Sequence, residues 1–446
     1  MILEEPLLSA YGRASSQPSP VNRMMAQFAA DFRDGVDINL GVGYVNENTI
    51  PRDGIRQALD EVLSNPQKYR FALNYGGPTG SANLIESIRR FYLEHRIGGL
   101  TEQVLSGRQI IIGANGASSL LEAVAQVLAP GLVVTADPLY YIYCDFLERM
   151  GFELLAVPQD QQGLDIRRLE AILDRLGDRQ AQIRFFYLVT VNNPTGTILS
   201  NRRRQEVVEI AHRLSRRWGR KVPVIFDLAY ELLIHDPVQE PPLSGLLFDE
   251  LGLVYEMGTL SKILAPALRI GYLIGPDGPM LQAIVQKTSD AGFSAPLVLQ
   301  EMASVLLDRC AAEQIERVRA GYHQKAQKTG AWIQQRLGPY LEYTTGGQAG
   351  FYFYLTFRQI ETHEGSAFFR FLARTTGQPQ IDGPPEAKKP RVVYIPGQFC
   401  VHRHGELVEQ ARRQLRLSYG FEELERIDQA VRLMAEAAEY AETDQP

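Results

Sequence analysis

Between about residues 109 and 276 of this 446-residue chain, short apolar runs alternate with amphipathic stretches. The stretches between most of the runs carry a helical pattern, as at Ser118–Leu128, Tyr141–Arg149, Ile166–Leu176 and Arg202–Arg217. Strands that alternate with helices in this way are typical of a mostly parallel sheet covered by helices on both faces. We therefore predict an α/β fold here. The strand candidates are QIIIG at 109, LVVTAD at 132, ELLAVP at 153, RFFYLVT at 184, VPVIFD at 222, LVYEMGT at 253 and RIGYLIG at 269.

The chain beyond this region alternates differently. A long helical pattern covers Leu297–Leu337, and later helices are predicted at Ser366–Arg374 and Glu422–Tyr440. Strand candidates between and after them predict a smaller α+β domain. We divide the chain into an N-terminal arm with part of the small domain (1–48), a large domain (49–305) and a small C-terminal domain (306–446). The strand candidates of the small domain are FYFYLTF at 351, VVYIPG at 392 and QLRLSYG at 414.

Three further segments complete the predicted organisation. In the arm, a helix is expected around Asn22–Phe32, followed by an extended glycine-rich segment at 38–46. A second helix pattern runs from Pro51 to about Leu63. The polar, proline-rich stretch Gly377–Arg391 is predicted to be an exposed loop.

Composition excludes several classes of protein. Hydrophobic residues make up 45% and charged residues 22% of the chain, which is ordinary for a globular protein with a substantial core. The net charge of −6 disfavours a nucleic-acid surface, and no apolar run approaches the ~20 residues of a membrane span. The acidic start MILEEPLLSAYGR argues against a signal peptide. The three isolated cysteines, Cys144, Cys310 and Cys400, fit a reducing cytoplasm.

Three short motifs carry the chemistry: VNNPTGT at 191, VIFDLAY at 224 and GTLSKILAPALRIGY at 258. Each lies at or just past the C-terminal end of a predicted strand, the edge of a parallel sheet where ligands bind. Singly, each has an ordinary interpretation: a turn, a helix cap at Asp227 and a surface charge at Lys262. Together and in this order they are specific.

The three motifs resemble the signature of pyridoxal-phosphate-dependent aminotransferases of class I/II, which have fold type I. The resemblance covers about Ile38 to Tyr419. It implies an enzyme that exchanges an amino group between an L-amino acid and a 2-oxo acid, through pyridoxal phosphate held as an imine on Lys262. Pyridoxal phosphate acts as an electron sink, and the protein supplies its binding and orientation.

The resemblance also implies roles for individual residues. Lys262 holds the cofactor and moves the proton, Asp227 keeps the pyridine nitrogen protonated, and Tyr230 and Asn193 supply donors to the phenolic oxygen. Arg416, with the backbone at Gly43 and with Asn193, binds the substrate carboxylate, for which a planar fork of donors is suited. The turn into the helix after 113 suits the phosphate, because helix N-termini bind anions. The other implied cofactor contacts are Gly116, Ala117, Ser118, Thr259, Arg269, the stacking ring of Tyr140, and Tyr75, which crosses to the partner site of a homodimer.

Substrate identity and reaction type stay open at this stage. The N-terminal stretch (about Leu8–Pro51), NYGGPTG at 74 and the region from PGQFCVHRHGE to LRLSYG most resemble valine–pyruvate aminotransferases. Other pyridoxal-phosphate reactions on the same fold remain possible: a β-lyase, a racemase-like or an oxidative activity. A transcriptional regulator needs an N-terminal DNA-binding domain, and we expect too little chain before Ile38 for one. A degenerate binding protein is disfavoured because Lys262, Asp227, Asn193 and Arg416 are all present.

Two basic clusters have ordinary interpretations. His402 and His404 form a weak metal pattern, and a structural or substrate-pocket role is favoured over a metal. The arginines at 202–204 are predicted to be the solvated face of a helix start.

Overall fold

The computed structural model describes residues 6–384 and 387–443, and its centre is an eight-stranded sheet with the strand order β2-β9-β8-β7-β6-β3-β4-β5. Strands β4, β3, β6, β7 and β8 pair in parallel, whereas β9 runs antiparallel between β8 and β2. The predicted mostly parallel sheet is therefore confirmed. Its strands are β2 (Arg108–Ile112), β3 (Leu132–Asp137), β4 (Glu153–Asp160), β5 (Gly163–Leu164), β6 (Ile183–Val189), β7 (Val224–Asp227), β8 (Val254–Thr259) and β9 (Gly271–Pro276).

Helices cover both faces of this sheet because alternate residues of each strand point to opposite sides. In β7, Val224 and Phe226 belong to one buried cluster and Ile225 to the other. The second cluster contains side chains of α6 (Gly116–Val127), α7 (Tyr141–Arg149) and α10 (Pro279–Asp290). The first contains side chains of α4 (Ala82–Glu94), α8 (Ile166–Leu176), α9 (Asn201–Trp218) and α11 (Leu297–Arg309).

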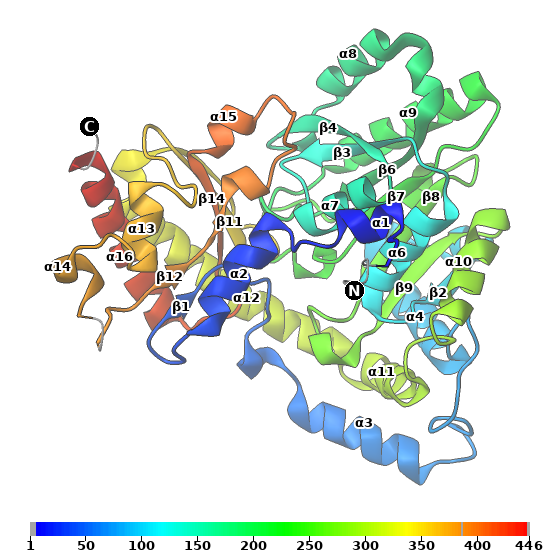
Figure 1. Ribbon diagram of the computed structural model, residues 1–446. Helices are drawn as coiled ribbons and strands as arrows, with labels where there is room; N and C mark the ends of the chain where they lie inside the picture. Colours follow the sequence, from blue (N-terminus) through cyan, green and yellow to red (C-terminus); the bar gives the residue numbers. More distant parts are fainter. Residues whose placement is uncertain (1–5, 385–386, 444–446) are drawn as a thin grey trace, which may run out of the picture.

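A smaller domain lies beside the large sheet (Figure 1). Its antiparallel sheet has the order β10-β11-β14-β13. Helices α13 (Ala367–Ala373) and α16 (Leu424–Thr443) pack against each other, and α16 also packs on the long α12 (Ala311–Arg336). The strands are β10 (Leu341–Gly346), β11 (Tyr352–Phe357), β13 (Ile395–Pro396) and β14 (Gln414–Ser418).

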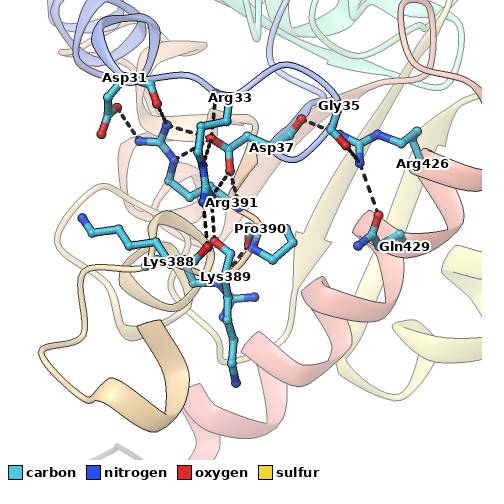
Figure 2. A network of polar contacts seen from close by, with 11 residues as sticks. Asp31, Arg33, Gly35, Asp37, Lys388, Lys389, Pro390, Arg391, Arg426 and Gln429 are labelled. Atoms are coloured by element: carbon cyan, nitrogen blue, oxygen red, sulfur yellow. Dashed lines mark hydrogen bonds and ion pairs between the residues drawn. The ribbon is translucent and has the colours of Figure 1, made fainter. Parts of the chain in front are cut away.

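The N-terminal arm joins the small domain. Its helices are α1 (Ala10–Ala14) and α2 (Pro20–Ala30), and its strand β1 (Ile38–Asn39) pairs in parallel with β12 (Val392–Val393). A polar network fixes this junction (Figure 2). Arg391 donates to both Asp37 and Asp31, and Arg33 donates to Asp37 and to the backbone oxygens of residues 388 and 389.

Several local predictions need correction. The long helical pattern after Leu297 is two helices, α11 and α12, which meet at Cys310. Strand β10 was not predicted, because its sequence LEYTTG is largely exposed and lacks an apolar run. The proline-rich loop contains a short helix, α14 (Pro379–Asp382), and residues 385–386 of that loop lie outside the described residues, as do residues 1–5 of the chain start. The remaining helices are α3 (Arg52–Ser64), α5 (Glu102–Leu105) and α15 (Val408–Ala411).

The prediction that residues 202–204 form a solvated face is wrong for Arg204. Its side chain is fully buried, and both terminal nitrogens pair with the carboxylate of Glu231, at 3.0 and 2.8 Å. A bidentate carboxylate partner of this kind offsets the desolvation of a buried guanidinium. Within the described residues, no helix is both long enough and apolar enough to cross a membrane.

Candidate active site

Lys262 lies in the turn that follows β8, and its amine is held inside the protein. The Nζ atom donates a hydrogen bond of 2.9 Å to the backbone oxygen of Gly43, which belongs to the N-terminal arm. Burial, together with the positive charges of Arg416 and Arg269, lowers the pKa of the amine from 10.5 to about 8. The neutral, nucleophilic form of this lysine is therefore accessible near neutral pH.

Asp227 is the last residue of β7, in the middle of the large sheet. It is 4% exposed, and its two carboxylate oxygens accept different hydrogen bonds. The hydroxyl of Tyr187 donates to Oδ2 at 2.9 Å, and the backbone N–H of Ala229 donates to Oδ1 at 3.0 Å. Burial raises the pKa of Asp227 above its usual value, although both hydrogen bonds and the charge of Lys262 act in the opposite direction.

Arg416 projects from β14 of the small domain and is 2% exposed. Its Nη1 donates to Oδ1 of Asn193 at 2.7 Å, and Nη2 donates to the backbone oxygen of Gly41. The guanidinium carbon lies 4.6 Å from the ring centre of Tyr352. In the described part of the chain these acceptors are neutral and no carboxylate pairs with Arg416, and its Nε has no hydrogen-bond partner. This cation is thus buried with only neutral acceptors.

Tyr352 links the lysine side of the site to the arginine side. Its hydroxyl lies 2.8 Å from the hydroxyl of Tyr230, and both side chains are buried. A Cβ atom added at Gly43 would lie 2.6 Å from the Tyr352 hydroxyl oxygen. Close approach of Tyr352 therefore explains the glycine at this position. A place for Gly43 beside the substrate carboxylate stays a prediction.

The N-terminus of α6 faces Arg269. No side chain caps this helix, and a Cβ atom added at Gly116 would lie 2.9 Å from Nη2 of Arg269. Arg269 has a left-handed backbone (φ 54°) and donates from Nε to the side chain of Asn115 at 2.7 Å. A helix N-terminus beside a guanidinium is a suitable environment for a phosphate group. Ala117 and the exposed Ser118 stand in the first turn of the same helix.

Thr259 and Tyr140 lie close to these groups, whereas Tyr75 stands at the protein surface. The Thr259 hydroxyl donates to the backbone oxygen of Ile270 at 2.9 Å, which ties the end of β8 to the start of β9. Tyr140 directly precedes α7 and interacts electrostatically with Asp227 and Arg416. Tyr75 is 81% exposed and packs on Phe293, with ring centres 5.4 Å apart.

Sequence reasoning missed Tyr187 and Tyr352. Both are tyrosines in mainly apolar strands, RFFYLVT and FYFYLTF. A hydroxyl in such a strand is the one available signal, since a buried hydroxyl needs a partner.

The loop that carries His402 and His404 packs against α7. His402 Nε2 lies 3.8 Å from the carboxylate of Glu148, and Arg403 pairs with the same carboxylate. Among the described residues no three metal-binding side chains come together.

Comparison with known proteins shows the family to which this chain belongs. The family model for aminotransferases of class I and II matches residues 36–375. The 2-aminoadipate transaminase of Thermus thermophilus is 27% identical over 394 residues, which are 87% of this chain and 86% of that protein. The uncharacterized HTH-type transcriptional regulator YisV of Bacillus subtilis is 24% identical over 417 residues, 90% of this chain and 73% of its own.

The fold has solved counterparts as well. The multiple substrate aminotransferase from Thermococcus profundus superposes with a TM-score of 0.81 at 22% identity, covering 96% of each chain. The chain therefore belongs to the class I and II aminotransferases and has their fold type I architecture. It is a transaminase that uses pyridoxal phosphate to exchange an amino group between an amino acid and a 2-oxo acid. The likeness to valine–pyruvate aminotransferases in particular stays a prediction.

The residues present fit the cofactor. The uncapped N-terminus of α6 and Arg269 suit its phosphate, the Asp227 carboxylate suits its ring nitrogen, and the amine of Lys262 has a lowered pKa. Bound pyridoxal phosphate supplies an electron sink for the pair of electrons released when a bond at the substrate Cα is broken.

Proposed function

We propose that this enzyme transfers the amino group of L-α-amino acids and that Arg416 recognises their α-carboxylate. The observation that carries the proposal is a buried guanidinium without a carboxylate partner in the described part of the chain, near the amine of Lys262. Burying an unpaired charge is costly, so the site is suited to a ligand that brings the opposite charge. Asn193, which accepts from Nη1, orients the guanidinium.

The other roles follow from the same arrangement. Lys262 binds the cofactor and carries the proton to and from the substrate carbon, because its amine is readily deprotonated. Asp227 holds the ring nitrogen, and Tyr230 with Asn193 donates to the phenolic oxygen. Tyr140 stacks on the ring. The phosphate is held by Gly116, Ala117 and Ser118 at the N-terminus of α6, with Thr259 and Arg269, and Gly43 leaves room beside the substrate carboxylate.

We further propose a cytoplasmic homodimer with shared active sites. Tyr75 stands at the surface with other exposed apolar side chains, including Phe71, Leu73 and Phe293, which would be covered by a partner subunit. The cysteines are free, as in a reducing compartment. The pairing of β1 with β12 supports a division at 1–48, 49–305 and 306–446, with the arm contributing to the small domain.

Two experiments test these proposals. The enzyme loaded with pyridoxal phosphate is incubated with single amino acids and no acceptor, and one 2-oxo acid per site should form together with pyridoxamine phosphate. Release of ammonia with unchanged cofactor would instead mean a lyase, and peroxide formation an oxidase. For the dimer, mixing Tyr75→Phe and Lys262→Ala subunits should restore part of the activity that each lacks, whereas a fully active monomer in sedimentation would refute sharing.

A further inference from the structure

Among the described residues the carboxylate of Asp227 has two donors, and one of them is a side chain outside the predicted site. Tyr187 is fully buried, and its hydroxyl lies 2.9 Å from Oδ2 of Asp227. An ionised carboxylate can only accept, so the tyrosine donates. Burial raises the pKa of Tyr187 well above its usual value, so that the hydroxyl keeps its proton.

Sheet register places the two residues on one face. Tyr187 in β6 pairs with Ile225 in β7, and Val189 pairs with Asp227. Tyr187 and Asp227 are therefore diagonal neighbours on the side of the sheet covered by α6 and α7, since side chains alternate along a strand. This arrangement fixes the carboxylate from within the sheet. In the described part of the chain each carboxylate oxygen accepts one hydrogen bond, so each can still accept from a ligand.

We propose that Tyr187 is a positioning residue, whose hydroxyl keeps Asp227 ionised and oriented toward the ring nitrogen of pyridoxal phosphate. The inference rests on the role proposed for Asp227 and adds the group that makes that role possible. Burial favours the neutral acid, which cannot pair with a protonated ring nitrogen. The hydrogen bond from Tyr187 favours the charged form and opposes this tendency.

The chain offers a matched control. Tyr143 in α7 is also buried, and its ring lies against that of Tyr187, with centres 4.7 Å apart. In the described part of the chain its hydroxyl has no hydrogen-bond partner. Tyr143→Phe thus removes the same atom from the same aromatic cluster without breaking a hydrogen bond to Asp227.

The test measures the affinity of the cofactor-free protein for pyridoxal phosphate and for a ring analogue in which C–H replaces the pyridine nitrogen. Tyr187→Phe should weaken binding of pyridoxal phosphate roughly tenfold, the loss expected for a hydrogen bond to a charged group. It should leave affinity for the analogue nearly unchanged, because the analogue cannot use Asp227. The turnover number should fall roughly tenfold or more for the same reason, and Tyr143→Phe should leave all three quantities unchanged.

The reference variant Asp227→Asn distinguishes a wrong role for Tyr187 from a wrong role for Asp227. If Tyr187→Phe weakens both ligands equally while Asp227→Asn affects pyridoxal phosphate selectively, Tyr187 is only a packing residue and the inference is overturned. If Asp227→Asn also changes the affinities for pyridoxal phosphate and for the analogue equally, the proposed role of Asp227 itself is wrong. Should Tyr187→Phe fail to fold, a fluorinated tyrosine at 187 keeps the ring and changes donor strength. It must then alter affinity for pyridoxal phosphate and not for the analogue.

Discussion

Asp37 and Asp227 are both buried aspartates, but their surroundings differ. Asp37, in the arm network, accepts hydrogen bonds from the side chains of Arg33 and Arg391, at distances of 2.6 to 3.2 Å (Figure 2). Although burial alone would raise its pKa, these bonds hold the pKa well below the usual value. Asp227 has one hydroxyl and one backbone donor, and its pKa is raised.

The arginines of the two regions show the same contrast. Arg391 pairs with two aspartates at 2.7 and 2.9 Å. In the described part of the chain Arg416 instead donates to neutral acceptors, among them Asn193 and the backbone oxygen of Gly41. In the arm, the protein satisfies its buried charges internally, and they serve stability. In the site, the charges keep unused bonding capacity, which is what a site needs in order to bind charged ligands. Substitutions in the arm should therefore change stability, and those in the site should change catalysis.

The largest expected effect is that of Lys262→Ala on turnover. The substitution removes both the amine that holds the cofactor and the group that moves the proton, so the turnover number should fall at least about 10⁴-fold. The thermal midpoint should not fall, because a buried amine with a lowered pKa contributes little to stability. Borohydride reduction of the wild-type enzyme and peptide mass mapping should place the cofactor label on Lys262. Label on another lysine would contradict the assignment.

Asp37→Asn should have the largest effect on stability. It leaves two partly buried guanidinium groups without their shared carboxylate, at a cost of about 3–5 kcal/mol in the free energy of unfolding. Because the pKa of Asp37 is lowered on folding, its contribution is present above the ordinary value of 3.8 and is lost as the pH falls below it. Urea unfolding at pH 7 and at pH 3 measures this difference.

The control for the arm is Asp31→Asn. This aspartate also pairs with Arg391, but its side chain is 64% exposed, so the loss should stay below about 1 kcal/mol. Turnover per folded site should be normal in both variants. A large loss of turnover in Asp37→Asn at a temperature where the protein is folded would contradict the claim that charges in the arm serve stability and not catalysis.

Arg416→Ala should lower kcat/KM for α-amino acids about 10²-fold or more, because the substrate carboxylate loses a bidentate, buried partner. Amines that lack the carboxylate should react equally well with both enzymes. Affinity for pyridoxal phosphate, measured by titration of the cofactor-free protein, should change little. Equal losses for amines and amino acids would make Arg416 structural, and the carboxylate site would have to lie elsewhere.

The fold was predictable because its signals are local. The strand at RFFYLVT, the helix at Ile166–Leu176 and the motif around Lys262 can each be recognised within a few residues, and their periodicity follows from burial. The predicted site residues of the two domains also lie together: Lys262 contacts Gly43, and Arg416 contacts Asn193. Their chemical roles remain predictions, and the experiments above test them.

What the sequence could not show depends on contacts between distant segments. Asp37 and Arg391 are 354 residues apart, and Arg204 and Glu231 meet only through the packing of α9 on the sheet. Tyr187 reaches Asp227 through strand register, which no local pattern specifies. The break between α11 and α12 was missed for a related reason. Apolar spacing continues through Cys310, and the change in backbone direction there depends on what each helix packs against.

The smallest expected effect is a shift in the pH dependence of cofactor capture when the charge of Arg416 is removed. Capture of pyridoxal phosphate by the cofactor-free enzyme requires the neutral amine of Lys262, whose pKa is lowered to about 8 by burial and by the charges of Arg416 and Arg269. The rate of capture should therefore rise with pH and level off above about pH 8. Arg416→Gln removes one of the positive charges, so the midpoint should move to higher pH. Arg412→Gln, which removes an exposed arginine paired with Glu361, should leave it in place. Stopped-flow absorbance between pH 6 and 10 measures how the capture rate depends on pH. If Arg416→Gln leaves the midpoint of this dependence unchanged, the charge of Arg416 does not contribute to the lowered pKa of Lys262.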